Sequence, residues 1–144
     1  MGDPAGVGPE VCLKAISHSK VRRSCIPIII GDLKVLKFHA QKMQINNNLK
    51  AIESSEIRQI QDKELNYNPV IDLKNVKVNQ NMFGKIRSSF GQASAKYIEV
   101  GIELIKSKLS EAIVTGPIHK EAFNSAGYMY PGHTEFITSL VGGR

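Results

Sequence analysis

A chain of 144 residues with a hydrophobic fraction of 42% and a charged fraction of 22% has the composition of one globular domain, or of part of one. No apolar run is long enough to cross a bilayer and no signal peptide follows Met1, so we expect a cytoplasmic chain that contacts no membrane. The net charge of +6 suits an anionic ligand. Because aromatic residues are not interleaved with the basic ones, solvated helix faces are favoured over nucleic-acid binding. Cys12 and Cys25 do not form a C-x-x-C pair, and both are expected to be reduced.

The chain opens on a loop at residues 2–8, which contains three glycines and a proline. Pro9 then suits the first position of a helix, where its missing N–H leaves nothing unpaired, and we predict a helix over residues 9–17. A glycine-rich loop that leads into a helix can hold an anion on its free N–H groups. A tight connection between two elements is the alternative. The glycine spacing matches neither G-x-G-x-x-G nor a Walker A loop, so no standard nucleotide-binding motif is present.

The middle of the chain alternates short apolar runs with helical patterns. Residues 26–30 predict a buried strand, and Asp32 is placed to cap the helix that follows. The remaining predictions for this part are short strands at residues 49–53 and 70–73, a half-exposed edge at Val76 and Val78, and mostly loop over residues 54–69.

The clearest helix is predicted over residues 91–109. Its apolar positions follow spacings of 3, 4, 3 and 4 and are Ala95, Ile98, Ile102, Ile105 and Leu109. Gly101 interrupts this helix at a cost of about 1 kcal/mol relative to alanine, so we expect a neighbour to pack closely against it. A buried strand is predicted next, over residues 112–115. A helix followed by a short buried strand is typical of α/β proteins with a parallel or mixed sheet.

The Thr115-Gly116-Pro117 break is expected to end this strand and to turn the chain outward. Lys120 then begins a short predicted helix, residues 120–125, where a cation opposes the helix dipole. A bound anion would explain that placement, which makes Gly116 and Lys120 candidates for anion binding; a solvent-facing lysine is the alternative. His119 is interpreted as either a ligand or a turn residue.

A second polar loop carries His133 and Thr134, with Thr134 expected to cap a helix over residues 135–140. An imidazole beside a hydroxyl can bind the polar groups of a substrate, and a simple cap with a surface histidine is the alternative. No metal site is predicted, because the four histidines show no metal-binding spacing. They are His18, His39, His119 and His133.

Three segments occur in the order of the N-terminal signatures of the 4-hydroxythreonine-4-phosphate dehydrogenase family of vitamin B6 biosynthesis, which the chain resembles over its whole length. The segments are residues 2–10, 115–120 and 132–136, and residues 84–85 and 91–94 also fit the family pattern. The resemblance implies a three-layer α/β/α fold similar to isocitrate and isopropylmalate dehydrogenases, here incomplete. It implies NAD-dependent oxidation of 4-phosphohydroxy-L-threonine with decarboxylation, and it implies that His133 and Thr134 bind the substrate.

The resemblance also implies NAD, a divalent metal (Zn, Mg or Co) whose ligands lie beyond residue 144, and a homodimer. Residues 1–144 would then be the N-terminal portion of the dehydrogenase, with one truncated α/β domain plus the start of the second. We accordingly expect this chain to be truncated and inactive by itself. The alternatives are a dehydrogenase of 4-phospho-D-threonate and a catalytically silent relic that binds phosphate.

Overall fold

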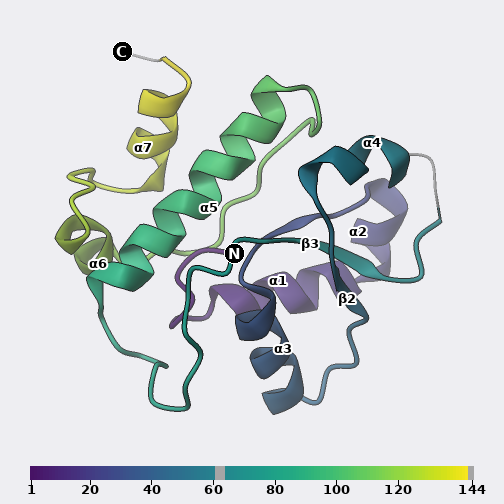
Figure 1. Cartoon of the computed structure of the whole chain (residues 1–144), viewed down its shortest axis with the longest axis horizontal. Coiled ribbons are helices and arrows are strands. Elements are labelled where there is room, and N and C mark those ends of the chain that lie inside the picture. Colours follow the sequence, from purple (N-terminus) through teal and green to yellow (C-terminus); the bar gives the residue numbers. More distant parts are fainter. Residues whose placement is uncertain (61–63, 143–144) are drawn as a thin grey trace.

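A three-stranded parallel sheet lies at the centre of the fold (Figure 1), which the computed structural model describes for residues 1–60 and 64–142. Its strands are β1 (Ile29–Gly31), β2 (Leu49–Ala51) and β3 (Asn68–Asp72), and β3 lies between the other two. Parallel strands with helices between them confirm the predicted α/β class. Gly31 pairs with Asp72, so the carboxyl ends of β1 and β3 meet at one edge of the sheet. Ligands bind at this edge in open parallel sheets.

Helices surround the sheet, and α6 (Lys120–Ser125) and α7 (His133–Leu140) lie beside the long helix α5 (Ser88–Lys106) (Figure 1). The others are α1 (Gly8–Ser17), α2 (Ser19–Ser24), α3 (Leu33–Lys42) and α4 (Ile57–Ile60), with a 3-10 turn η1 (Ser54–Glu56). The predicted helices at residues 9–17 and 120–125 are confirmed, and α5 begins and ends three residues before its predicted bounds. Within the described ranges, no helix combines the length and the apolar character that a membrane span requires.

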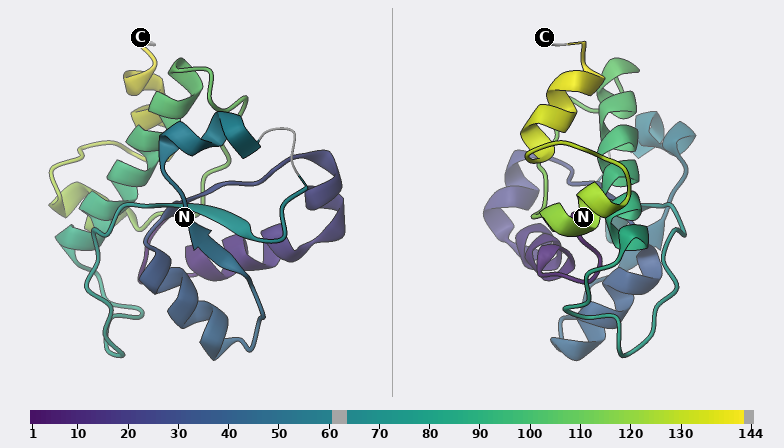
Figure 2. Two further views of the ribbon diagram at one scale, coloured as in Figure 1. Left: turned by 45° about the vertical axis from the view of Figure 1, so that its right-hand side comes forward. Right: turned by 90° about the vertical axis from the view of Figure 1, so that its left-hand side faces the viewer.

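Helix α5 contributes buried side chains to two separate parts of the core, because it is buried on more than one side. Ala95, Ile98 and Ile102 face a cluster that includes residues of α6 and α7, whereas Phe90 and Tyr97 belong to the core that contains the sheet. Figure 2 shows α6 and α7 together on one side of α5. The predicted close approach at Gly101 is confirmed: an added Cβ would lie 2.5 Å from Ile113 Cδ1 and 3.4 Å from Ile30 Cδ1.

The predicted strand over residues 112–115 is wrong. The segment belongs to no ladder, and Val114 is 94% exposed. β1 pairs with β3 alone among the described strands, so its other edge forms no ladder with this segment. The side chain of Ile113 still packs against α5, and this contact explains the apolar character of the run.

Two other predictions for the middle of the chain are corrected. Val76 and Val78 form no strand, because the N–H of Val76 donates to Asp32 Oδ1 at 2.8 Å rather than to a ladder. Residues 54–69, predicted mostly as loop, contain η1, α4 and the first two residues of β3, while residues 61–63 lie outside the described part. A reciprocal capping box between Glu53 and Glu56 starts this helical stretch.

Helix α2 was not predicted, because its six residues bury no side chain and so leave no apolar pattern. It begins after His18, whose Nδ1 accepts the N–H of Lys20 at 3.3 Å. Cys25 follows the helix and is exposed, whereas Cys12 is half-buried on α1. Both thiols are free.

Candidate functional site

The opening loop and the Gly116-Pro117 turn lie against each other, although more than a hundred positions separate them in the sequence. The N–H of Asp3 donates to Pro117 O at 2.9 Å, and the amino group of Met1 donates to Ile30 O, also at 2.9 Å, which ties the start of the chain to β1. A Cβ on Gly2 would overlap the carbonyl oxygen of Pro117, and one on Gly116 would lie 2.6 Å from Met1 O. Glycine is therefore required here because two backbones touch.

This packing bears on the anion-binding prediction for the opening loop. Residues 1–5 are all buried, and a Cβ on Gly8 at the start of α1 would overlap Met1 O. Neighbouring backbone thus packs directly against the loop and leaves little room for a ligand. This favours the interpretation of the loop as a tight connection over an anion-binding loop. Gly116 as an anion-binding residue stays a prediction, since its N–H has no partner among the described residues.

Asp3 is the one carboxylate of the opening loop and is 7% exposed. Its Oδ1 accepts the N–H of Ala5 at 2.9 Å. Burial raises the pKa of the Asp3 carboxyl above its ordinary value, and the bond from Ala5 and the nearby His119 oppose that rise. The Asp3 carboxyl thus belongs to a residue whose backbone is bonded to the Gly116-Pro117 turn.

Helix α6 is seated on the first turns of α5, and this contact places both His119 and Lys120. A Cβ on Gly91 would overlap Ala122 O and lie 2.7 Å from Phe123 N, so the two helix backbones touch at Gly91. His119 caps α6, because its Nδ1 accepts the N–H of Ala122 at 3.4 Å. Lys120 is exposed and forms no hydrogen bond or ion pair within residues 1–60 and 64–142, so its charge is free for a ligand.

Helix α7 begins at His133, but Thr134 does not cap it, contrary to the prediction. Gly132 takes the cap position with an extended backbone, which moves Thr134 into the first turn, where its side chain is exposed. His133 is half-buried. The hydroxyl of Thr134 is consequently not used to begin the helix and is available to a ligand.

An aromatic cluster that the sequence analysis missed holds α6 and α7 together. The ring of Phe136 lies 5.3 Å from that of Phe123, 5.3 Å from that of Tyr128 and 5.2 Å from that of Tyr130. Edge-to-face arrangements of this kind stabilise beyond their buried area. Four of the nine Phe and Tyr residues fall within residues 123–136, and that concentration was the available signal. The cluster places the starts of α6 and α7 on the same side of α5 (Figure 2).

The carboxyl ends of β1 and β3 carry two aspartates with structural partners. Asp32 is 1% exposed and accepts the hydroxyl of Tyr97 at 2.5 Å as well as the N–H of Val76. Burial raises the pKa of Tyr97 far above its ordinary value, and the bond to Asp32 adds to this effect. Asp32 occupies the N-cap position of α3, as predicted, but its side chain makes no cap bond. The N–H of Leu33 donates to Asp72 Oδ1 at 3.0 Å instead.

The residues brought together on this side of the molecule are polar, but they do not complete a cofactor site. Within the ranges that the structure describes, no three His, Cys, Asp or Glu side chains are grouped to hold a metal ion. The opening loop, which lacks a dinucleotide motif, is filled by neighbouring backbone. These residues therefore do not fit a metal or NAD without further groups.

Comparison with known proteins identifies the relatives of this chain. The family model for pyridoxal phosphate biosynthetic protein PdxA matches residues 23–144. A D-threonate 4-phosphate dehydrogenase from Cupriavidus necator is 35% identical over 142 residues, which cover 99% of this chain and 41% of that protein. The chain thus spans about two fifths of the length of this relative.

Solved structures agree with this match. A 4-hydroxythreonine-4-phosphate dehydrogenase from Burkholderia phymatum is 36% identical with a TM-score of 0.88, over 100% of this chain and 42% of that one. The enzyme of the same name from Klebsiella pneumoniae is 26% identical with a TM-score of 0.82, over 97% of this chain and 41% of that one. The chain belongs to the pyridoxal phosphate biosynthetic protein PdxA family.

Proposed function

We propose that this chain forms part of an NAD-dependent dehydrogenase that oxidises 4-phosphohydroxy-L-threonine, with decarboxylation, in vitamin B6 biosynthesis. The observation that carries the proposal is the likeness to the Burkholderia phymatum enzyme, with 36% identity and a TM-score of 0.88 over the whole chain. This structural match covers 100% of the chain, and it therefore includes the opening loop, the Gly116 turn and the His133 loop. Dehydrogenase chemistry is common to the named relatives.

A second substrate, 4-phospho-D-threonate, has its own support. The Cupriavidus necator relative that bears this activity in its name is 35% identical over nearly the whole chain. Both substrates present a phosphate, a hydroxyl and a carboxylate. The same residues of this chain would therefore serve either substrate.

In the proposal, the residues of this chain bind and orient the substrate. The imidazole of His133 and the hydroxyl of Thr134 hydrogen-bond to its polar groups, and the ammonium of Lys120 with the N–H of Gly116 attracts its anionic group. NAD would accept the hydride, and a divalent metal (Zn, Mg or Co) would stabilise negative charge. Because the described residues do not fit these two groups by themselves, we assign their ligands to residues beyond 144.

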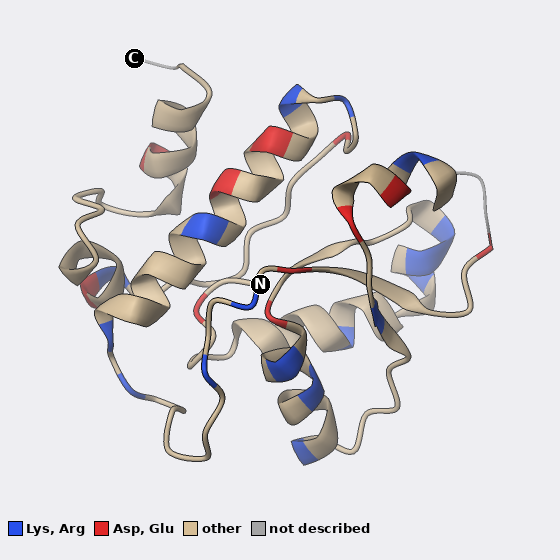
Figure 3. Cartoon of the chain, viewed as in Figure 1, with Lys and Arg blue, Asp and Glu red and all other residues tan. Residues whose placement is uncertain are grey.

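The finer features of the family resemblance are part of the same proposal. They are the three-layer architecture similar to isocitrate and isopropylmalate dehydrogenases, the division of residues 1–144 between one α/β domain and the start of a second, the homodimer and the cytoplasmic location. Lys and Arg are spread over several elements, among them α2 and α3 (Figure 3), which supports a small anionic substrate over a nucleic acid.

A chimera tests the proposal: this chain replaces the aligned segment of the Cupriavidus necator enzyme, and NADH formation is measured with both substrates and each metal. We expect turnover, and the substrate with the higher kcat/KM identifies the activity. His133→Ala and Thr134→Val should each raise KM or lower kcat by about tenfold or more. A folded chimera that produces no NADH with either substrate would contradict the proposal.

The isolated chain is a separate part of the proposal. Because it corresponds to 41% of its Cupriavidus necator relative, we propose that it is inactive alone, either as part of an enzyme or as a relic that binds phosphate without chemistry. The purified 144-residue chain should form no NADH under the conditions that suit the chimera. Turnover by the chain at the rate of the chimera would show that this part is wrong.

A further inference from the structure

A cavity of about 390 Å³ lies at the amino-terminal edge of the sheet, opposite the edge that carries the candidate site. Its walls come from α2, from Ile26 and Pro27 just before β1, and from Asn68 and Pro69 at the start of β3. Figure 1 shows α2 beside the start of β3, away from the amino terminus of the chain. Cavities of this size hold small organic ligands, typically about 300–1,000 Å³. None of the residues proposed for the dehydrogenase reaction lines it.

Two arginines bring positive charge to this cavity. Arg22 is held in place by uncharged acceptors: Nη1 donates to Asn68 Oδ1 at 3.3 Å and Nη2 to Leu65 O at 3.0 Å. Asn68 is 5% exposed, so the guanidinium is fixed to a buried group. Neither Arg22 nor Arg23 forms an ion pair with any residue that the structure describes. A guanidinium that is oriented but not neutralised is prepared to bind a carboxylate or a phosphate through its remaining donors.

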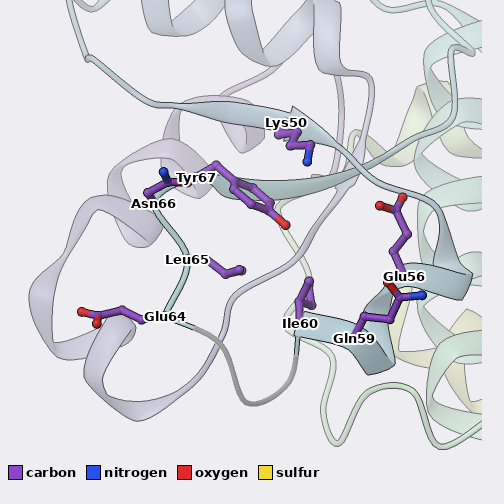
Figure 4. A pocket seen from close by; sticks show the side chains of 8 residues that line it. All are labelled: Lys50, Glu56, Gln59, Ile60, Glu64, Leu65, Asn66 and Tyr67. Atoms are coloured by element: carbon purple, nitrogen blue, oxygen red, sulfur yellow. The ribbon is translucent and has the colours of Figure 1, made fainter.

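The rest of the wall is suited to an apolar body. Ile26, Pro27, Leu65 and Pro69 supply aliphatic surface, and Tyr67 also lines the cavity. Leu65 and Tyr67 also line a neighbouring cavity of about 360 Å³, in which the ammonium of Lys50 lies 4.7 Å from the Tyr67 ring centre (Figure 4).

One acidic residue, Glu64, also lines the cavity and opposes an anion there. Figure 4 shows its carboxylate directed away from the side chains of Leu65 and Tyr67. Set against Arg22 and Arg23, this single negative charge leaves the cavity with a net positive charge. The attraction for an anion is therefore reduced by Glu64 but not removed.

We propose that this cavity binds a small organic anion, a phosphate monoester or a carboxylate, whose apolar or ring-shaped body lies against the aliphatic part of its wall. Arg22 binds the anionic group, and Arg23 adds charge to the same rim. The site is separate from the proposed dehydrogenase site and needs no metal or NAD. Its test therefore requires only the 144-residue chain.

The experiment titrates the ¹⁵N-labelled chain with phenyl phosphate, with benzoate and with benzyl alcohol as the uncharged match, at about 0.15 M salt to screen diffuse attraction. Saturable amide shifts of residues 22–26 and 65–68 with either anion, and none with benzyl alcohol, support the proposal. The anion that binds more tightly identifies the ligand class. Shifts that never saturate, or equal shifts with benzyl alcohol, would overturn it.

Variants separate the site from the general positive charge of the chain. Arg22→Gln should weaken anion binding by about tenfold or more, because a charged hydrogen bond is lost. Arg58→Gln removes the same charge from an exposed position on α4 and should change the affinity by less than about twofold. Equal weakening by the two variants would overturn the proposal.

Two further variants keep the test decisive if Arg22→Gln fails to fold. Arg23→Gln, whose side chain has no hydrogen bond within residues 1–60 and 64–142, should fold normally and weaken binding severalfold. Glu64→Gln should tighten binding, because it removes the opposing charge. An unchanged affinity in both variants would refute the assignment.

Discussion

Gly91 offers a sharp test of how α6 is positioned, because the backbone of α6 rests on it. In Gly91→Ala, the new Cβ would overlap Ala122 O and lie 2.3 Å from Ala122 C and 2.7 Å from Phe123 N. A backbone cannot rotate away as a side chain can, so α6 must shift. Overpacking of this kind costs about 1–3 kcal/mol, and the gain in helix propensity from alanine, about 1 kcal/mol in a helix interior, is smaller near the helix start. We expect a net loss of about 2 kcal/mol.

Gly101→Ala is the matched control in the same helix. Its Cβ would lie 2.5 Å from Ile113 Cδ1, which is the end of a flexible side chain and can move. The strain and the propensity gain then nearly cancel, and we expect a change within about 1 kcal/mol. Urea unfolding of both variants, followed by circular dichroism, gives the two values from the midpoints at equal m. If Gly91→Ala is as stable as Gly101→Ala, the contact between α5 and α6 does not constrain the fold as we argue.

Three further predictions concern buried polar groups and the candidate site. Tyr97→Phe should lower the free energy of unfolding by about 2–3 kcal/mol, because the buried carboxylate of Asp32 loses a donor; a loss below about 0.5 kcal/mol in urea unfolding would contradict this. Burial lowers the pKa of His39 below its ordinary 6.5, so the unfolded chain binds more protons and stability should fall as pH drops below about 6.5, a slope that His39→Gln should reduce. A wild-type urea midpoint that increases as the pH is lowered below about 6.5 would contradict the predicted direction of the pH dependence. Thr134→Val should leave the unfolding midpoint unchanged, since the hydroxyl caps nothing, and a large loss of stability would show that Thr134 is structural.

Local sequence patterns were sufficient where one helix face or one turn decides the structure. The 3-4 spacing located α5 and its close approach at Gly101, and Pro9 located the start of α1 to within one residue. The helix at residues 120–125 followed from a Gly-Pro break and a small polar segment. Each of these features depends on residues within a few positions of one another.

The misassigned elements depend on partners that are distant in the sequence. An apolar run at residues 112–115 has the composition of a strand, but a ladder needs a neighbouring edge, and the run instead packs Ile113 against α5. The start of β3 was assigned to a loop because residues 54–69 are polar and weakly patterned. Within this segment, Pro69 is unfavourable in the interior of a central strand. It is tolerated as the second residue, where the strand begins.

For the candidate site, the sequence predicted which motifs matter but not how they meet. The hydrogen bond from Asp3 to Pro117 joins the first and second signatures, and the ring contact of Phe136 with Phe123 joins the third signature to α6. The first contact leaves no trace in local spacing, and the second is indicated only by the concentration of Phe and Tyr within residues 123–136. The roles of His133 and Thr134 in substrate binding stay predictions, whereas their place on the α6 side of α5 is observed.

The two aspartates after β1 and β3 show why position alone does not assign chemistry. Both lie at the edge where parallel sheets bind ligands, and Asp32 follows β1 directly. Yet Asp32 is covered completely and holds Tyr97 and Val76, while Asp72 binds the first N–H of α3. Both carboxylate oxygens of Asp32 and one oxygen of Asp72 thus accept bonds from the protein. Position at this edge therefore does not by itself assign a residue to a ligand. Lys120 and Thr134, whose side-chain polar atoms make no hydrogen bond within residues 1–60 and 64–142, stay candidates for ligand binding.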